Sequence, residues 1–155
     1  MELTPPEVHL TRRGTMRLIP GRYPSAGILD QIAAPGDLDA IFELEGWTND
    51  RISNELGIIH TIARDEWVVG MPMASVVMAA YCHPRPGGGR FNDESRGAWY
   101  AALSLRTAHA EAIHARTREL EEIGGWFETT MQMAAYVADF NADFHDLRGE
   151  RFARS

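Results

Sequence analysis

The sequence predicts an α+β protein, because short apolar runs of strand type alternate with longer segments of helical periodicity. Three of the strand-like runs are Thr15 to Ile19, Val76 to Tyr81 and Trp99 to Leu103. Residues 27–57 and 104–120 instead repeat apolar residues at the three- and four-residue spacing of a helix face. We therefore expect a sheet flanked by these two helical regions.

The chain length and its composition fit a single domain spanning residues 1–155. A chain of 155 residues, 45% of them hydrophobic, is long enough for one core and short for two. Residues 1–13 hold two prolines and little periodicity, so we expect an N-terminal arm or edge segment there. In the short strand that follows, Arg17 points to the face opposite Met16 and Leu18.

Charge and cysteine content exclude several classes of protein. The net charge of −7 and the pI near 5.3 argue against nucleic acid as a direct partner. Every basic residue is arginine, so any phosphate-binding position relies on arginine. The one cysteine, Cys82, excludes an internal disulfide and a cysteine cluster for zinc. Neither a signal peptide nor a membrane span is recognisable, which predicts a cytoplasmic protein.

The region between the first strand and the glycine run is expected to be mostly scaffold. Residues 27–57 predict three short helices, with Asp37 as the cap of the second. Residues 58–70 predict a loop and a strand, and His60 is a structural histidine or a pocket residue. Val76 to Tyr81 reads as a buried strand, although its front also fits a helix. On a strand, Cys82 and the neighbouring His83 point to opposite faces, which disfavours a nucleophile pair.

Residues 87–111 carry the chemistry that stands out. The run Gly87-Gly88-Gly89 lets the backbone approach a ligand, with its N–H groups free to meet an anion. Arg90 adds a planar guanidinium that matches phosphate. Tyr100 can stack on a ring, and Glu111 can stabilise positive charge. The stretch also fits a plain hairpin loop with a surface arginine, followed by an exposed helical glutamate.

The helix that follows is expected to start at Ser104 and to continue to about Leu120. Serine is a favoured N-cap residue, and alanines at helical spacing form a small-residue stripe that Glu111 borders. Glu111 and His114 also spell E-x-x-H, half of a di-iron motif. No second such pair exists in the sequence, and the predicted strands disagree with a four-helix bundle.

The last third of the chain predicts strands. Residues 124–147 alternate in polarity and fit one or two strands after a Gly-Gly pair. Met131 and Met133 are expected to pack in the core. Residues 143–149 are expected to form a final strand and turn.

Several blocks together resemble the RES domain. The run GGGRFN is followed by Y-x-A-x-S-x(3)-A-x(2)-E, which runs from Tyr100 to Glu111. Residues 17–20, 78–84 and 145–149 extend the resemblance. The RES family comprises bacterial toxins of toxin–antitoxin systems, similar in fold to ADP-ribosyltransferases, that act on NAD. The resemblance implies a split, strongly bent mixed sheet that clamps a dinucleotide cleft.

The resemblance also implies roles for particular residues. Glu111 would stabilise the positive centre as nicotinamide leaves, and Arg17 and Arg90 would hold the dinucleotide; Arg22 is the alternative to Arg17. NAD would be the co-substrate, with no metal. The implied partner is an antitoxin, DNA-binding and inserted into the cleft. The further residues implied in NAD binding are Tyr81, His83, Asn92, Tyr100 and Ser104.

The resemblance leaves the acceptor and the catalytic competence open. Many RES domains continue past a segment like His145 to Gly149 with a further helix, strands and a serine near the site. This sequence stops at Ser155, so it is either a shortened member or one with impaired activity. We expect transfer of ADP-ribose to a protein. NAD hydrolysis or phosphorolysis, or a non-catalytic partner-binding module, are the alternatives.

Overall fold

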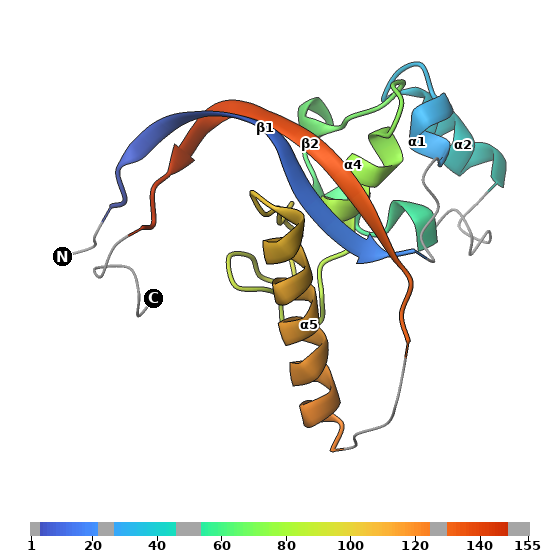
Figure 1. The fold of residues 1–155 in the computed structure, drawn as a ribbon. Helices are drawn as coiled ribbons and strands as arrows, with labels where there is room; N and C mark the ends of the chain where they lie inside the picture. The colour runs from blue at the N-terminus through green and yellow to red at the C-terminus, as the bar shows by residue number, and fades with distance from the viewer. Residues whose placement is uncertain (1–3, 22–26, 46–53, 125–129, 149–155) are drawn as a thin grey trace. The chain divides into compact units, whose positions relative to one another are not determined.

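The structure, a computed structural model, describes residues 4–21, 27–45, 54–124 and 130–148. These residues divide into two compact units (Figure 1). One unit, here called the strand unit, combines Met1–Gly21 with Ala101–Ser155. The other, here called the helical unit, is Arg22–Tyr100. The predicted α+β class is confirmed, and one domain over 1–155 stays a prediction.

The strand unit is built on a long antiparallel ribbon of two strands. Strand β1 spans Glu7–Pro20 and strand β2 spans Met133–His145 (Figure 1). The pairing shifts register between Arg12 and Thr15, which marks a β-bulge. Of the N-terminal arm or edge segment expected over residues 1–13, residues 7–13 form part of an edge strand and are no free arm. These residues are part of β1 because β2 supplies their hydrogen-bonding partners.

The two faces of the ribbon differ in burial. Arg17 lies opposite Tyr136 and Thr15 opposite Ala138, and these four residues share the less exposed face. Thr15 is buried and its hydroxyl donates to the Ala138 carbonyl at 2.7 Å. On the other face, Val137 is 64% exposed. Arg17 is therefore directed to the covered side of the ribbon, as its alternation with Met16 predicts.

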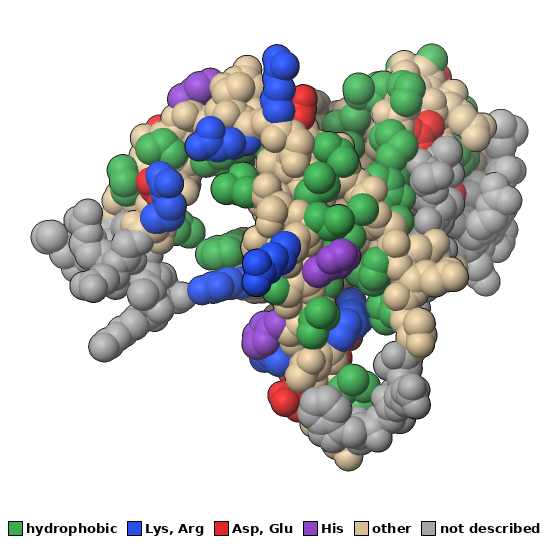
Figure 2. Space-filling model, in the orientation of Figure 1, with side chains coloured by type: hydrophobic (Ala, Val, Ile, Leu, Met, Phe, Trp, Pro, Cys, Tyr) green, Lys and Arg blue, Asp and Glu red, His purple; other side chains and the backbone are tan. Residues whose placement is uncertain are grey.

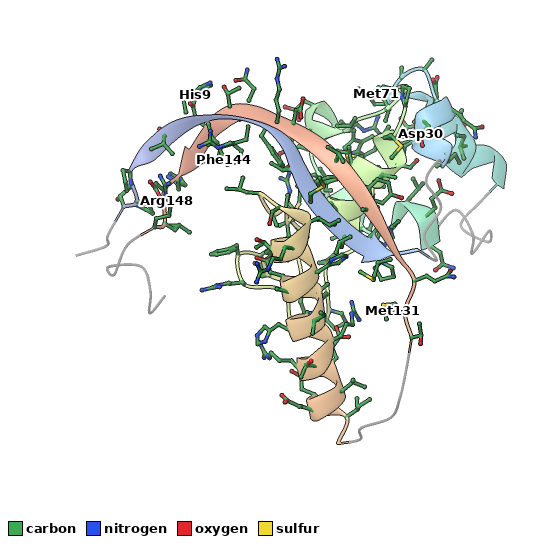
Figure 3. The ribbon with its side chains drawn as sticks, viewed as in Figure 1. His9, Asp30, Met71, Met131, Phe144 and Arg148 are labelled. Carbon is green, nitrogen blue, oxygen red and sulfur yellow. The ribbon has the colours of Figure 1, made fainter. Side chains whose placement is uncertain are left out.

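On the N-terminal side of the bulge, between Glu7 and Thr11 of β1, the ribbon has one polar and one apolar face. On the polar face, His9 contacts Asp143 at 2.8 Å and Asn141 at 3.1 Å. On the other, Val8 pairs with Phe144. Figure 3 shows His9 and Phe144 on opposite sides of the ribbon. Figure 2 shows that hydrophobic and arginine side chains both reach the surface along this part of the ribbon.

Helix α5, Leu105–Glu122, packs against β1 within the strand unit. Met16 and Ala102 exchange two backbone hydrogen bonds of 2.8 Å just before the helix begins. This isolated bridge replaces the strand expected over Trp99 to Leu103, so that prediction is wrong. Ala102 bonds to the edge of β1 at Met16, and the chain then continues into helix α5.

The helical unit is a cluster of short helices around one apolar core. Helices α1, α2 and α4 span Ile28–Gln31, Asp37–Glu45 and Ala74–Cys82. Two 3-10 helices, η2 and η3, span Ile59–Thr61 and Arg64–Glu66. The buried core residues are Leu29, Ile32, Leu38, Leu56, Ile59, Ile62, Ala74, Met78 and Cys82.

Helix α4 corrects the strand predicted over Val76 to Tyr81. Six of its nine residues are buried, and a helix buried on nearly all sides carries a continuous apolar run without amphipathic period. A short apolar run therefore does not distinguish a buried strand from a buried helix. The expected strand in residues 58–70 is wrong too, because η2 and η3 occupy that segment.

A few local predictions have mixed outcomes. Asp37 is the first residue of α2, and its carboxylate accepts from the Ala33 and Ala34 N–H groups at 2.9 and 2.8 Å. The third predicted helix is seen at residues 54–56, and its predicted start lies outside the described residues. Arg22, the alternative to Arg17, also lies outside the described residues. Met131 is 45% exposed, so its assignment to the core is wrong.

The last predicted strand and the expected mixed sheet also differ from the structure. Asp143 to His145 are the end of β2 and form no separate strand. Among the described residues the sheet has two antiparallel strands, instead of the split mixed sheet that was expected. No helix within the described residues is long and apolar enough to cross a membrane.

Candidate functional site

The glycine loop, Gly87–Asn92, uses its amides internally. The Gly87 N–H donates to the Glu94 carboxylate, and the Gly88 N–H donates to the Arg85 carbonyl at 2.8 Å. The Gly89 N–H donates to the Asn92 carbonyl at 2.7 Å. The expectation that these N–H groups are free to meet an anion is therefore wrong. The glycines serve the shape of the loop, and any anion must be held by a side chain.

Tyr100 closes the glycine loop through its hydroxyl. That hydroxyl accepts the Phe91 N–H at 3.1 Å and donates to Oδ1 of Asn92 at 2.7 Å. The Asn92 amide nitrogen donates in turn to the carbonyls of Asp93 at 2.9 Å and Arg96 at 3.1 Å. The polar atoms of Asn92 are thus engaged in fixing the loop.

Two of the three glycines are closely approached by neighbouring atoms. A Cβ on Gly89 would lie 2.6 Å from Oδ1 of Asn92 and 2.7 Å from the Tyr100 hydroxyl. Gly88 has φ of +73°, and a Cβ there would lie 2.6 Å from the Asn92 carbonyl oxygen. The loop therefore depends on its glycines at the point where Asn92 and Tyr100 meet.

Arg90 and Phe91 are the side chains that this loop presents outward. Both are exposed, and 63% of Phe91 is accessible to solvent. The Arg90 guanidinium lies 5.5 Å from the centroid of the Phe91 ring, within the range of a cation–π interaction. Within the described part of the chain, Arg90 forms no ion pair with a carboxylate. It is therefore a cation available to an anionic ligand.

A polar turn supports the loop from its C-terminal side. The Asp93 carboxylate accepts the Ser95 N–H at 2.8 Å and also the Ser95 hydroxyl. These hydrogen bonds hold the pKa of Asp93 below its ordinary value. An aspartate that binds the N–H two residues ahead is a common turn device. The sequence N-D-E-S, residues 92–95, carries the signal for this turn.

Tyr81 and His83 have contacts within the helical unit. Tyr81 is half-buried at the end of α4, and the Arg96 guanidinium lies 5.3 Å from its ring centroid. Arg96 also pairs with Glu66. Nε2 of His83 donates to the Glu55 carbonyl at 3.0 Å. Both residues thus have structural partners, whatever further role they have.

Cys82 lies between them and is buried. Burial raises the pKa of its thiol to about 12, although the Arg96 charge acts in the opposite direction. A thiol with such a pKa is protonated at neutral pH and is a poor nucleophile. A Cys82–His83 nucleophile pair is therefore not supported, although the strand geometry on which it was disfavoured is replaced by α4.

The remaining candidate residues belong to the strand unit. Arg17 is partly buried on β1, opposite Tyr136. Ser104 is the N-cap of α5, since its hydroxyl accepts the Thr107 N–H at 3.1 Å. Its predicted capping role is confirmed. Glu111 is exposed on the second turn of α5, and within the described part of the chain its carboxylate forms neither a hydrogen bond nor an ion pair.

The alanine stripe of α5 explains where Glu111 lies. Ala108, three residues earlier, is 6% exposed, and Ala115, four residues later, is half-buried. Glu111 therefore borders the packed face of the helix and is itself solvated. In the described residues no group of three or more His, Cys, Asp or Glu side chains is arranged to hold a metal ion.

An α+β protein whose ordered glycine loop displays an exposed guanidinium is a candidate for binding an anionic ligand. The family model of the RES domain matches residues 58–155. Since this match covers more than half of the chain, the protein belongs to the RES domain family. The match contains the glycine loop, Tyr100 and Glu111, whereas Arg17 lies outside it. No curated protein and no solved structure matches the chain at a significant level.

Proposed function

We propose that this RES domain protein binds NAD and cleaves the bond between nicotinamide and ribose, as the toxin of a bacterial toxin–antitoxin pair. The observation that carries the proposal is the family match over residues 58–155, which includes Arg90 and Glu111. An ADP-ribosyltransferase-like fold and action on NAD are what membership of this family suggests.

Two features of the residues support the proposal. Arg90 is an exposed guanidinium without a carboxylate partner in the described residues, and guanidinium groups match phosphate oxygens. Glu111 is a carboxylate, and a carboxylate is the type of group that stabilises a cation developing at a ribose C1 atom. Arg17, Tyr81, His83, Asn92, Tyr100 and Ser104 stay proposed contributors to NAD binding.

In the proposed reaction the C–N bond to nicotinamide breaks, and nicotinamide leaves with the bonding electron pair. Positive charge then develops on the ribose, where the Glu111 carboxylate stabilises it in the transition state. A nucleophile bonds to C1 and loses its proton. We propose that this nucleophile belongs to a protein; water or phosphate would give hydrolysis or phosphorolysis.

One assay tests the proposal and distinguishes the acceptors. Purified protein is incubated with NAD labelled in its adenine half, with and without bacterial cell extract, and nicotinamide release is measured. Release together with one or a few labelled protein bands, all absent for Glu111→Gln, supports transfer. Release with no labelled band decides for hydrolysis or phosphorolysis. No nicotinamide release in either condition overturns the enzymatic function.

A second candidate function is a non-catalytic partner-binding module of the RES family. The exposure of both Arg90 and Glu111 favours it, because catalytic charges are often withdrawn from bulk water. A module of this kind would leave NAD intact and would not slow growth when strongly expressed.

A toxin that consumes NAD must be restrained, so the proposal includes a co-encoded antitoxin. We expect the antitoxin to be a small DNA-binding protein whose C-terminal carboxylate binds arginines of this chain. Co-expression with the neighbouring gene should restore growth, and the two proteins should copurify. If strong expression of this protein alone is harmless, both the restraint and the toxin function are contradicted.

A further inference from the structure

Phe91 is the aromatic residue of the glycine loop that is open to a ligand, although Tyr100 is the one that the sequence singles out. Phe91 is 63% exposed and follows Arg90 directly. A large exposed aromatic ring on an ordered loop is costly in water, because its apolar surface stays solvated. Such a ring is therefore a natural place for a planar ligand.

The loop holds Phe91 in place through its backbone and its ring. The Phe91 N–H donates to the Tyr100 hydroxyl at 3.1 Å, and the rings of the two residues lie 29° from parallel with 6.4 Å between centroids. Tyr100 is anchored by its hydrogen bond to Asn92. The tyrosine thus supports the phenylalanine, which makes Tyr100 a positioning residue.

Arg90 supplies the second part of a nucleotide-binding pair. Its guanidinium lies over the Phe91 ring at 5.5 Å from the centroid. The long stem of an arginine allows the guanidinium to turn from the ring to a phosphate. An aromatic ring beside a cation is the combination with which proteins hold a base and its attached phosphates.

We propose that Phe91 is the ring on which the adenine of NAD stacks, with Arg90 binding the phosphates attached to that half of the molecule. The assignment rests on the proposed NAD function but concerns the adenine nucleotide alone. It moves the stacking role from Tyr100 to Phe91. It also predicts that ligands without a base bind poorly, since ribose phosphates engage Arg90 only.

Equilibrium titration of the full chain with ADP, ADP-ribose and ribose 5-phosphate tests this assignment. We expect the parent protein to bind ADP and ADP-ribose at least tenfold more tightly than ribose 5-phosphate. Phe91→Leu keeps an apolar side chain without a π face and should weaken ADP binding by about tenfold. Phe91→Tyr should restore most of the affinity. Binding of ribose 5-phosphate should stay within twofold of the parent in both variants.

Controls separate stacking from a merely structural role. Phe144→Leu, a matched change on the strand unit, should leave ADP affinity unchanged, and Phe91→Leu should keep the parent melting temperature. Absence of ADP binding by the parent, or ADP affinity unaltered in a folded Phe91→Leu protein, overturns the assignment. If ADP binds as expected but no nicotinamide is released from NAD, the assignment stands and the catalytic proposal fails.

Discussion

The hydroxyl of Tyr100 lies 2.7 Å from Oδ1 of Asn92 and thereby ties the C-terminal end of the glycine loop to Tyr100. The same hydroxyl accepts the Phe91 N–H, so one oxygen atom fixes both a side chain and the backbone beside Arg90. The three glycine amides are satisfied within the same region. The loop is thus ordered before any ligand binds, which lowers the entropy lost on binding.

Tyr100→Phe removes this hydroxyl and leaves the ring. Two hydrogen bonds are lost at an exposed position, so we expect ADP affinity to fall by roughly fivefold, equivalent to about 1 kcal/mol. Titration with ADP measures this. As a control, Tyr136→Phe on β2 removes a tyrosine hydroxyl outside the loop and should leave ADP affinity unchanged. Equal affinities for parent and Tyr100→Phe would show that the loop does not need the hydroxyl.

Gly89→Ala should disorganise the loop. The added Cβ would meet Asn92 Oδ1 at 2.6 Å and the Tyr100 hydroxyl at 2.7 Å, closer than a carbon can approach. We expect the Tyr100–Asn92 contact to break and binding of ADP to fall at least as far as in Tyr100→Phe. Gly36→Ala, where no atom lies within 4 Å of the added Cβ, is the matched control and should be neutral.

Glu111→Gln should reduce nicotinamide release by roughly two to three orders of magnitude, as loss of one positioned electrostatic group does. Because Glu111 is exposed, we expect the free energy of unfolding to change by less than about 0.5 kcal/mol. Glu121→Gln, an exposed glutamate on the same helix, should keep parent activity. Release within threefold of the parent in Glu111→Gln would remove this residue from the reaction.

Cys82 should be inert in the folded protein. With burial raising the pKa of the thiol to about 12, iodoacetamide at pH 8 should modify it only after denaturation. Mass spectrometry with and without urea measures the modification. Cys82→Ala should retain nicotinamide release within threefold. Rapid modification of the native protein would show that the thiol is accessible and ionised.

Asp146 should titrate at low pH. Hydrogen bonds from the Arg148 side chain and backbone lower the pKa of Asp146 from 3.8 to about 2. Because the folded-state pKa is depressed, the ion pair stabilises the fold above pH 3.8, and this contribution is lost as the pH falls toward 2. NMR titration of the carboxylate measures the midpoint. Arg148→Gln should return it toward 3.8, and a parent midpoint already there would contradict the pairing.

The local signals in the sequence determined several parts of this protein. The N-cap at Ser104, the α5 helix and the position of Glu111 beside an alanine stripe all follow from contacts within a few residues. A serine at a helix start and small residues at helical spacing act through such short-range geometry. The GGGRFN and Tyr100–Glu111 blocks likewise indicated the RES family, which the family match confirms.

Tertiary structure alone decided what depends on distant partners. Residues 7–13 become part of β1 because β2, more than 120 residues away, supplies their hydrogen bonds. The run at Val76 forms helix α4, and because the helix is buried on nearly all sides, its apolar sequence lacks the period that would distinguish it from a buried strand. The N–H groups of Gly87, Gly88 and Gly89 donate to Glu94, Arg85 and Asn92 in turn. The Tyr100 hydroxyl donates to the Asn92 side chain. Residue types show which groups can bond, and only the folded chain determines which of them meet.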